Sequence, residues 1–161
     1  MTHFYYHYPI PKGIMTVTEN GRAITGISFG RHNIKNAIYK QTPLLKMAGQ
    51  ELAEYFAGNR YEFDLPFEFE TSSPFQAKVW QALFTIPYGQ TATYKEIAEQ
   101  IGTPQAVQAV GQALHANPIA ICIPCHRIIR SNGTLSGYAG GLERKKHLLD
   151  LEKRTICCQS K

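Results

Sequence analysis

The sequence predicts a two-domain α/β protein. Residues 1–70 are predicted to form a small antiparallel sheet with one packed helix, and residues 71–161 a mostly helical domain with a helix-turn-helix. Two observations lead to this fold class: an Asn-Gly pair between apolar runs, which indicates a β-hairpin, and two helical segments around a glycine turn. With 161 residues, 43% of them apolar, the chain is long enough to bury a substantial core.

Three strands are predicted near the start of the chain. Residues 2–10 alternate aromatic and polar side chains, which is typical of a half-buried strand. Residues 14–18 and 23–29 are apolar runs on either side of Glu19-Asn20-Gly21-Arg22, where the Asn-Gly pair favours a tight hairpin. We therefore expect the three strands to pair antiparallel.

A helix and an edge strand are predicted to complete the first domain. Thr42-Pro43 is typical of a helix start, and apolar residues share one stripe as far as Ala57, before Gly58-Asn59 ends the helix. Residues 61–69 alternate again but contain Pro66. Because proline cannot donate to a sheet ladder, this segment is expected to be an edge strand.

The second domain is predicted to follow a linker at residues 71–73. Ser73-Pro74 combines a helix cap with a proline at the first helical position, so a helix is expected there. Residues 93–100 and 104–114 then have helical patterns, with the turn Ile101-Gly102-Thr103 between them. This arrangement is typical of a helix-turn-helix, although the pattern alone also fits an ordinary helical corner.

The second helix of this motif is thin and uncharged. No charged residue lies between Gln105 and Leu114, and Gln108 and Gln112 share a face with Gln105. Such a helix suits a narrow groove better than reading of base edges by arginine. Thr103 lies at its start, where free backbone amides favour a phosphate.

The segment Ile121–Ile129 is apolar but holds Cys125, His126 and Arg127 side by side. Its pattern is strand-like, yet burying such polar groups without partners costs several kcal/mol. Pro124 is expected to end or bend the strand and to leave Cys125 on a turn. A cysteine in this setting, next to a histidine and an arginine, indicates that Cys125 acts as a nucleophile.

A thiol next to an imidazole can become a thiolate, which is able to attack carbon. We expect His126 to act on Cys125 through one water, with Glu152 orienting the imidazole ring. A loop rich in glycine and serine follows at residues 130–141, and a last helix is predicted at residues 142–153. The glycines in this loop could let the backbone approach a flat ligand closely, but a plain flexible loop would have the same composition.

The cysteines leave two other kinds of site open. Cys122 and Cys125 form a C-x-x-C pair, but a strand-like run follows it where a thioredoxin-like redox site needs a helix. A zinc site needs a second ligand pair, and Cys157-Cys158 on an expected frayed tail is a poor candidate. We predict no metal and no cofactor. The remaining histidines that could be considered as ligands, but are expected at the surface, are His3, His7 and His32.

The net charge of +5 lies entirely in residues 120–161, which hold eight basic and three acidic residues. A solvated face and a polyanionic partner both explain this excess. No apolar stretch is long enough to span a membrane and no secretory leader is recognisable, so we expect a cytoplasmic protein. The four cysteines gather in the last quarter of the chain, which fits reduced thiols.

Several motifs together resemble a known family. Pro124-Cys125-His126-Arg127 is preceded by Asn117-Pro118 and followed by Gly137–Gly141 and Lys145. This combination resembles the O6-alkylguanine-DNA alkyltransferases, the methylated-DNA–protein-cysteine methyltransferases, and the likeness covers about residues 74–152. It implies a ribonuclease H-like first domain and a DNA-binding alkyltransferase second domain.

The resemblance implies a single-turnover DNA repair protein. Cys125 would take a methyl or alkyl group from O6 of guanine, and also from O4 of thymine, and keep it as a thioether. His126 would deprotonate Cys125 through water, Glu152 would orient His126, and Asn117 would brace the segment. Tyr94 would help to rotate the nucleotide out of the duplex and donate to the departing base.

The implied partner is double-stranded DNA with O6-alkylguanine, bound through the minor groove by a monomer that needs no membrane. The DNA-binding residues implied by the resemblance are Tyr94, Lys95, Thr103, Gln108, Arg127 and Ser131. The residues implied for the guanine pocket are Tyr138, Ala139 and Gly140.

Two positions depart from the family pattern. Gln108 stands where an arginine finger is common, and Ala139 stands where some members have a serine. The main alternative function is a non-catalytic binder of alkylated DNA, but the proteins of that kind lack the acceptor cysteine. A helix-turn-helix transcriptional regulator is less favoured, because its reading helix should offer charged or bidentate side chains to base edges.

Overall fold

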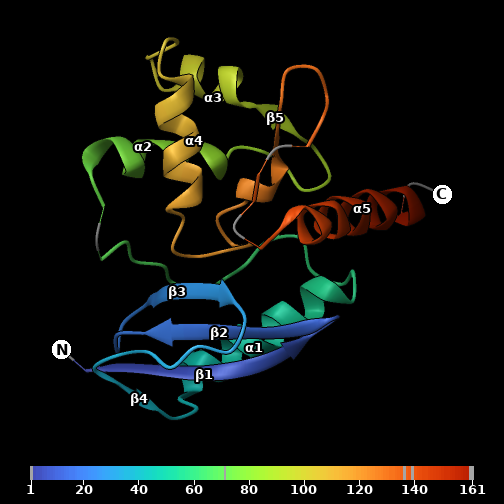
Figure 1. The fold of residues 1–161 in the computed structure, drawn as a ribbon. Helices are drawn as coiled ribbons and strands as arrows, with labels where there is room; N and C mark the ends of the chain where they lie inside the picture. The colour runs from blue at the N-terminus through green and yellow to red at the C-terminus, as the bar shows by residue number, and fades with distance from the viewer. Residues whose placement is uncertain (1, 71, 136, 139, 160–161) are drawn as a thin grey trace. The chain divides into compact units, whose positions relative to one another are not determined.

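The computed structural model describes residues 2–70, 72–135, 137–138 and 140–159, and the chain forms two compact units (Figure 1). Residues 1–70 and 118–122 make up the first unit, and residues 71–117 and 123–161 the second. The first contains a sheet with a helix and the second is mostly helical, which confirms the predicted α/β class. No helix among the described residues is both long enough and apolar enough to cross a membrane.

Within the described residues, the first unit holds a four-stranded sheet of order β3-β2-β1-β4. Strands β1 (His3–Ile10), β2 (Gly13–Glu19) and β3 (Ile24–Phe29) pair antiparallel as predicted. Strand β4 (Ala37–Tyr39) pairs parallel with β1, so the expectation of a purely antiparallel sheet is wrong in this respect. Three residues are too few to show alternation, which explains why the sequence did not reveal β4.

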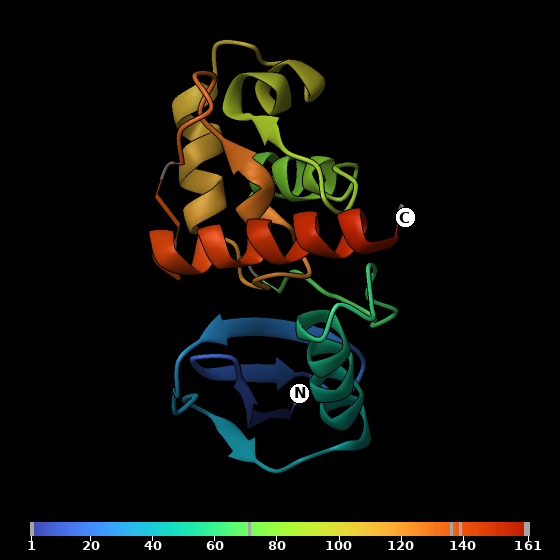
Figure 2. The same ribbon diagram turned by 90° about the vertical axis from the view of Figure 1, so that its right-hand side faces the viewer.

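Helix α1 (Pro43–Phe56) packs against the sheet (Figure 2). Its N-cap Thr42 accepts a hydrogen bond from the backbone N–H of Leu45, as expected of a capping threonine. The predicted edge strand at residues 61–69 is wrong, because Phe67 forms only an isolated bridge with Ile24.

A segment from the middle of the chain completes the edge of this sheet. Ile27 donates its backbone N–H to the carbonyl of Pro118, and Ala120 donates to the carbonyl of Ile27. Ile119, which pairs with Ile27, is fully buried. Residues 118–122 therefore belong to the first unit, which the local sequence pattern did not predict.

The second unit is built mainly from helices and is closed by one short parallel strand pair, β5 with β6. Its elements in chain order are α2 (Pro74–Leu83), β5 (Ala92–Thr93), α3 (Tyr94–Gln100), α4 (Val107–His115), the 3-10 turn η1 (Cys125–Arg127), β6 (Ile128–Ile129) and α5 (Leu142–Gln159). Helices α2, α3 and α4 pack together in Figure 1, with α3 and α4 forming the helix-turn-helix.

Local capping signals define the helix starts. Ser73 forms the predicted capping box at α2, and Thr93 forms a second one at α3. Gly102 adopts a φ of 84° in the turn that follows α3, a conformation that favours glycine. Helix α4 begins at Val107 rather than at Pro104, because a hydrogen bond from the Ala106 N–H to the Thr103 carbonyl first closes a separate turn.

The segment that carries the thiol differs from the strand-like run expected over Ile121–Ile129. Ile121 has a φ of 71°, which breaks the extended conformation, and residues 125–127 form η1. Only β6 is a strand. The prediction that Cys125 lies on a turn after Pro124 is therefore confirmed. The last helix, α5, is longer than predicted and places Cys157 on a helix rather than on a frayed tail.

We predict that Trp80→Phe destabilises the protein by about 1–3 kcal/mol. Trp80 is 1% exposed, and its indole N–H donates to the carbonyl of Ala113, which fixes α2 to α4. The substitution removes this hydrogen bond and leaves space in the core. Urea unfolding measures the change. Phe84→Leu is the control, since Phe84 is 45% exposed and its substitution should change stability by less than about 0.5 kcal/mol.

Candidate active site

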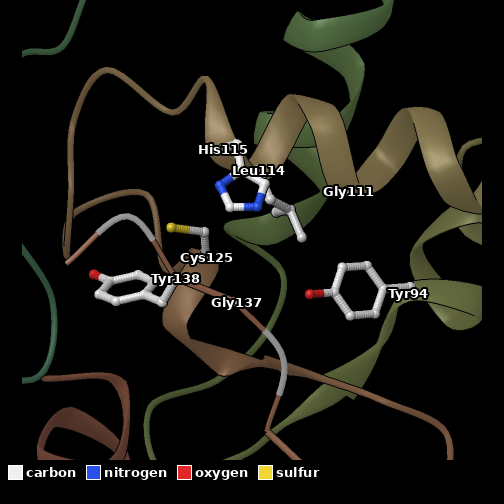
Figure 3. A pocket seen from close by; sticks show the side chains of 7 residues that line it. All are labelled: Tyr94, Gly111, Leu114, His115, Cys125, Gly137 and Tyr138. Carbon is white, nitrogen blue, oxygen red and sulfur yellow. The ribbon is translucent and has the colours of Figure 1, made fainter. Parts of the chain in front are cut away.

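A pocket opens in the second unit beside the helix-turn-helix (Figure 3). Its empty volume is about 330 Å³, which includes space open to solvent. It is lined by Tyr94, Gly111, Leu114, His115, Cys125, Gly137 and Tyr138. These residues come from the start of α3, the later part of α4, η1 and the loop before α5, so the fold brings together four separate parts of the chain.

Cys125 lies in this pocket with only 6% of its surface exposed. The side-chain amide of Asn117 donates to its Sγ atom over 3.0 Å and to the carbonyl of Ile123 over 3.0 Å. Burial raises the pKa of the Cys125 thiol to about 11, although the Asn117 hydrogen bond and the positive charge of Lys145 act in the opposite direction. Cys125 is therefore a thiol at neutral pH, and the thiolate that the neighbouring imidazole was expected to allow must form during the reaction.

His126 is completely buried and paired with a carboxylate. Its Nε2 atom lies 2.6 Å from Oε2 of Glu152. Burial lowers the pKa of His126 even though the hydrogen bond to Glu152 opposes this shift, so the ring is neutral at pH 7. A neutral ring that donates from Nε2 to the carboxylate has an acceptor at Nδ1. Within the described part of the chain, this buried Nδ1 has no hydrogen-bond partner.

Glu152 is the fully buried carboxylate at the centre of this network. Its Oε1 accepts from Nε of Arg127 at 2.9 Å and from the backbone N–H of Gly89 at 3.1 Å, and its Oε2 accepts from Nη2 of Arg127 at 3.1 Å. Burial would raise the pKa of Glu152, but the hydrogen bonds from His126 and Arg127 and the positive charge of Arg127 outweigh it and hold the pKa at about 2. The carboxylate is therefore ionised and fixed toward His126.

Arg127 points into the protein, which corrects its prediction as a DNA-binding residue. It is 7% exposed, and besides Glu152 its guanidinium donates to the carbonyl of Ile86 at 2.8 Å. The guanidinium also lies over the ring of Tyr88, 5.6 Å from its centroid. A guanidinium engaged in this way cannot reach a phosphate, so Arg127 supplies the buried positive charge that balances Glu152.

The other predicted DNA-binding residues lie at the surface of the same unit. Tyr94 is the first residue of α3, and its hydroxyl points into the pocket (Figure 3). The remaining predicted contacts are exposed: Lys95 on α3, Thr103 in the turn, Gln108 on α4 and Ser131 after β6. They are therefore accessible to a large partner.

Of the three residues predicted to line the guanine pocket, one lines the pocket in the structure. Tyr138 lines the pocket, and Gly140 is half-buried in the same loop. Ala139 lies outside the described residues. No group of three His, Cys, Asp or Glu side chains in the described ranges is arranged to hold a metal ion.

Sequence reasoning gave no role to His115 or Lys145. His115 borders the pocket at the end of α4. Lys145 is 1% exposed, and burial lowers its pKa to about 8 while the nearby Cys125 opposes that shift. Helical spacing could have revealed Lys145, because it shares one face of α5 with Leu148 and Glu152 at i, i+3 and i+7.

A cysteine supported by a His–Glu pair, set in a pocket beside a helix-turn-helix, defines a class of proteins that perform thiol chemistry on DNA. Residues 2–69 match the family described as 6-O-methylguanine DNA methyltransferase, ribonuclease-like domain, and residues 74–154 match its DNA binding domain. The chain therefore belongs to the 6-O-methylguanine DNA methyltransferase family.

Known proteins resemble the chain over nearly its whole length. The constitutive methylated-DNA–protein-cysteine methyltransferase of Bacillus subtilis is 42% identical over 158 residues, which cover 93% of this chain and 95% of that protein. The crystal structure of Mycobacterium tuberculosis O6-methylguanine methyltransferase matches with a TM-score of 0.87 and 40% identity, over 96% of this chain and 94% of that one. A structure described as the M. tuberculosis OGT in complex with DNA matches with a TM-score of 0.88 and 41% identity, over 94% of each chain.

We predict that Glu152→Gln removes an acid-dependent part of the stability. Because the pKa of Glu152 is about 2 in the folded protein against 4.5 ordinarily, its contribution is complete above about pH 5 and is lost as the pH falls toward 2. The contribution is on the order of 3 kcal/mol. Urea unfolding at several pH values should show a steeper loss for the unmodified protein than for the variant. Parallel pH profiles would contradict this assignment.

Proposed function

We propose that the chain repairs DNA by transferring a methyl or alkyl group from O6 of guanine, and from O4 of thymine, to Cys125. The observation that carries this proposal is the position of Cys125, a thiol inside a pocket that also holds the Tyr94 hydroxyl and lies beside the His126–Glu152 pair. Relatives that match over most of their length are named methylated-DNA–protein-cysteine methyltransferases. The resulting thioether is not hydrolysed, so each molecule reacts once.

The target nucleotide must first leave the base stack, because a thiol inside a pocket cannot reach O6 within a duplex. The Cys125 proton then passes through one bridging water to Nδ1 of His126, the atom that remains available as an acceptor. Glu152 accepts from Nε2 and stabilises the imidazolium that forms. A resting pKa of about 11 makes this assistance necessary, because little thiolate exists at neutral pH without it.

The thiolate then displaces guanine from the alkyl carbon. The new S–C bond forms as the C–O6 bond breaks, and the electron pair of the broken bond remains with the guanine. The Tyr94 hydroxyl delivers a proton that neutralises the departing guanine. The proton held by His126 then returns through solvent to the Tyr94 oxygen, so both side chains end neutral. Asn117 holds the sulfur in place through its 3.0 Å hydrogen bond during this step.

Helix α4 is proposed to enter the minor groove of double-stranded DNA. Residues 107–114 carry no charge, and the alanines and Gly111 keep the helix thin, which suits a groove about 6 Å wide. Gln108 is exposed there and would fill the space that the extruded nucleotide leaves. Exposed Lys95, Thr103 and Ser131 would contact the backbone. We propose that the protein binds as a monomer and acts in the cytoplasm, where thiols stay reduced.

A non-catalytic role in binding alkylated DNA is not favoured. Such a protein has no use for an acceptor thiol, whereas Cys125 is held by Asn117 and lines the pocket.

We predict that mixing the protein with excess duplex DNA containing O6-methylguanine adds one methyl group to Cys125. Intact-protein mass spectrometry followed by peptide mapping detects the methyl group and its position. Cys125→Ser should gain no mass under the same conditions. Unchanged mass in the unmodified protein, together with tight binding to the lesion, would instead support the non-catalytic alternative.

We predict that Tyr94→Phe slows methyl transfer by about 10²-fold, since removing one donor to a developing anion costs about this much. The measurement is single-turnover transfer from O6-methylguanine DNA. The reaction of Cys125 with iodoacetamide is the control and should be unchanged, because that reagent has no guanine leaving group. Equal losses in both reactions would place Tyr94 in thiol activation instead.

A further inference from the structure

His115 contacts the pocket loop next to the reactive thiol. It is the last residue of α4, and its side chain lines the same pocket as Cys125 and Leu114 (Figure 3). A Cβ atom built on Gly137 would lie 3.6 Å from both Cε1 and Nε2 of His115. The imidazole ring and the backbone of Gly137 therefore form one continuous part of the pocket wall.

The direction of attack determines what this wall touches. Displacement at carbon requires the sulfur of Cys125, the alkyl carbon and O6 to lie nearly in line. The reacting carbon of any alkyl group therefore takes the same place, between Sγ and the base. Any further carbon atoms must project sideways from that line, toward the side chains that surround Sγ. His115 is one of the side chains that line this pocket together with Cys125 (Figure 3).

We propose that His115, packed against Gly137, is a specificity-determining residue that limits the size of the alkyl group accepted by Cys125. This proposal rests on the proposed alkyl transfer and adds its substrate class, small unbranched O6-alkyl groups. The planar ring of His115 has only two side-chain torsions, so it has fewer ways to move aside than a long aliphatic chain such as that of lysine or methionine. A methyl group meets no obstruction, whereas a benzyl group meets the ring.

Two substitutions at this contact should change the selectivity in opposite directions. His115→Ala removes the ring and should raise the ratio of benzyl to methyl transfer rates by about tenfold, because a few carbon atoms of fit are worth this much. Gly137→Ala adds a methyl group to the same wall and should lower the ratio by a similar factor. The added Cβ makes ordinary van der Waals contact with His115, 3.6 Å from the ring, so the imidazole has no need to move.

The test measures single-turnover transfer from duplex DNA containing O6-methylguanine or O6-benzylguanine to each variant. His115→Phe is the matched control, since it keeps a ring and removes the nitrogen atoms, and its ratio should stay near that of the unmodified protein. Unchanged ratios in His115→Ala and Gly137→Ala would overturn the proposal, as would a Phe variant that behaves like the Ala variant. If His115→Ala does not fold, the ratio of benzyl to methyl transfer in Gly137→Ala alone tests the proposal, and an unchanged ratio overturns it. If the unmodified protein transfers no methyl group at all, that result would instead contradict the proposed function itself.

Discussion

The buried carboxylate of Glu152 is the interaction on which the second unit depends. It receives hydrogen bonds from His126 and Arg127 on η1 and from the backbone of Gly89, while its own backbone belongs to α5. Three parts of the chain that are far apart in sequence are thereby fixed by one side chain. Removing one partner of such a buried pair typically costs about 3–5 kcal/mol, because the other charge is left uncompensated. The geometry of the thiol segment is thus coupled to the stability of the fold.

The same burial that stabilises this network also restrains the nucleophile. Cys125 has its pKa raised by burial, and the neighbouring imidazole of His126 is neutral. A protein that can react only once benefits from a thiol that is protonated in the absence of DNA, since solution electrophiles react with the thiolate. Asn117 and Lys145 lower the cost of forming that thiolate without forming it in advance.

Features that depend on neighbouring residues could be predicted from the sequence, and features that depend on distant pairing could not. The hairpin, the capping box at Ser73 and the turn at Cys125 follow from local signals, and the structure contains all three. Strand β4 and residues 118–122 exist only through pairing with β1 and β3, so no local pattern marks them. Arg127 was misassigned for a similar reason: its charge suggested a phosphate, but its partner Glu152 lies 25 residues away.

The absence of charge along α4 has a consequence for the search for damage. Counterions are released from DNA in proportion to the number of phosphates that cationic side chains neutralise, and residues 107–114 offer no such side chain. The affinity contributed by this helix should therefore vary little with ionic strength. Recognition would then depend more on groove shape and on the ease of unstacking a weakened base pair than on electrostatic attraction.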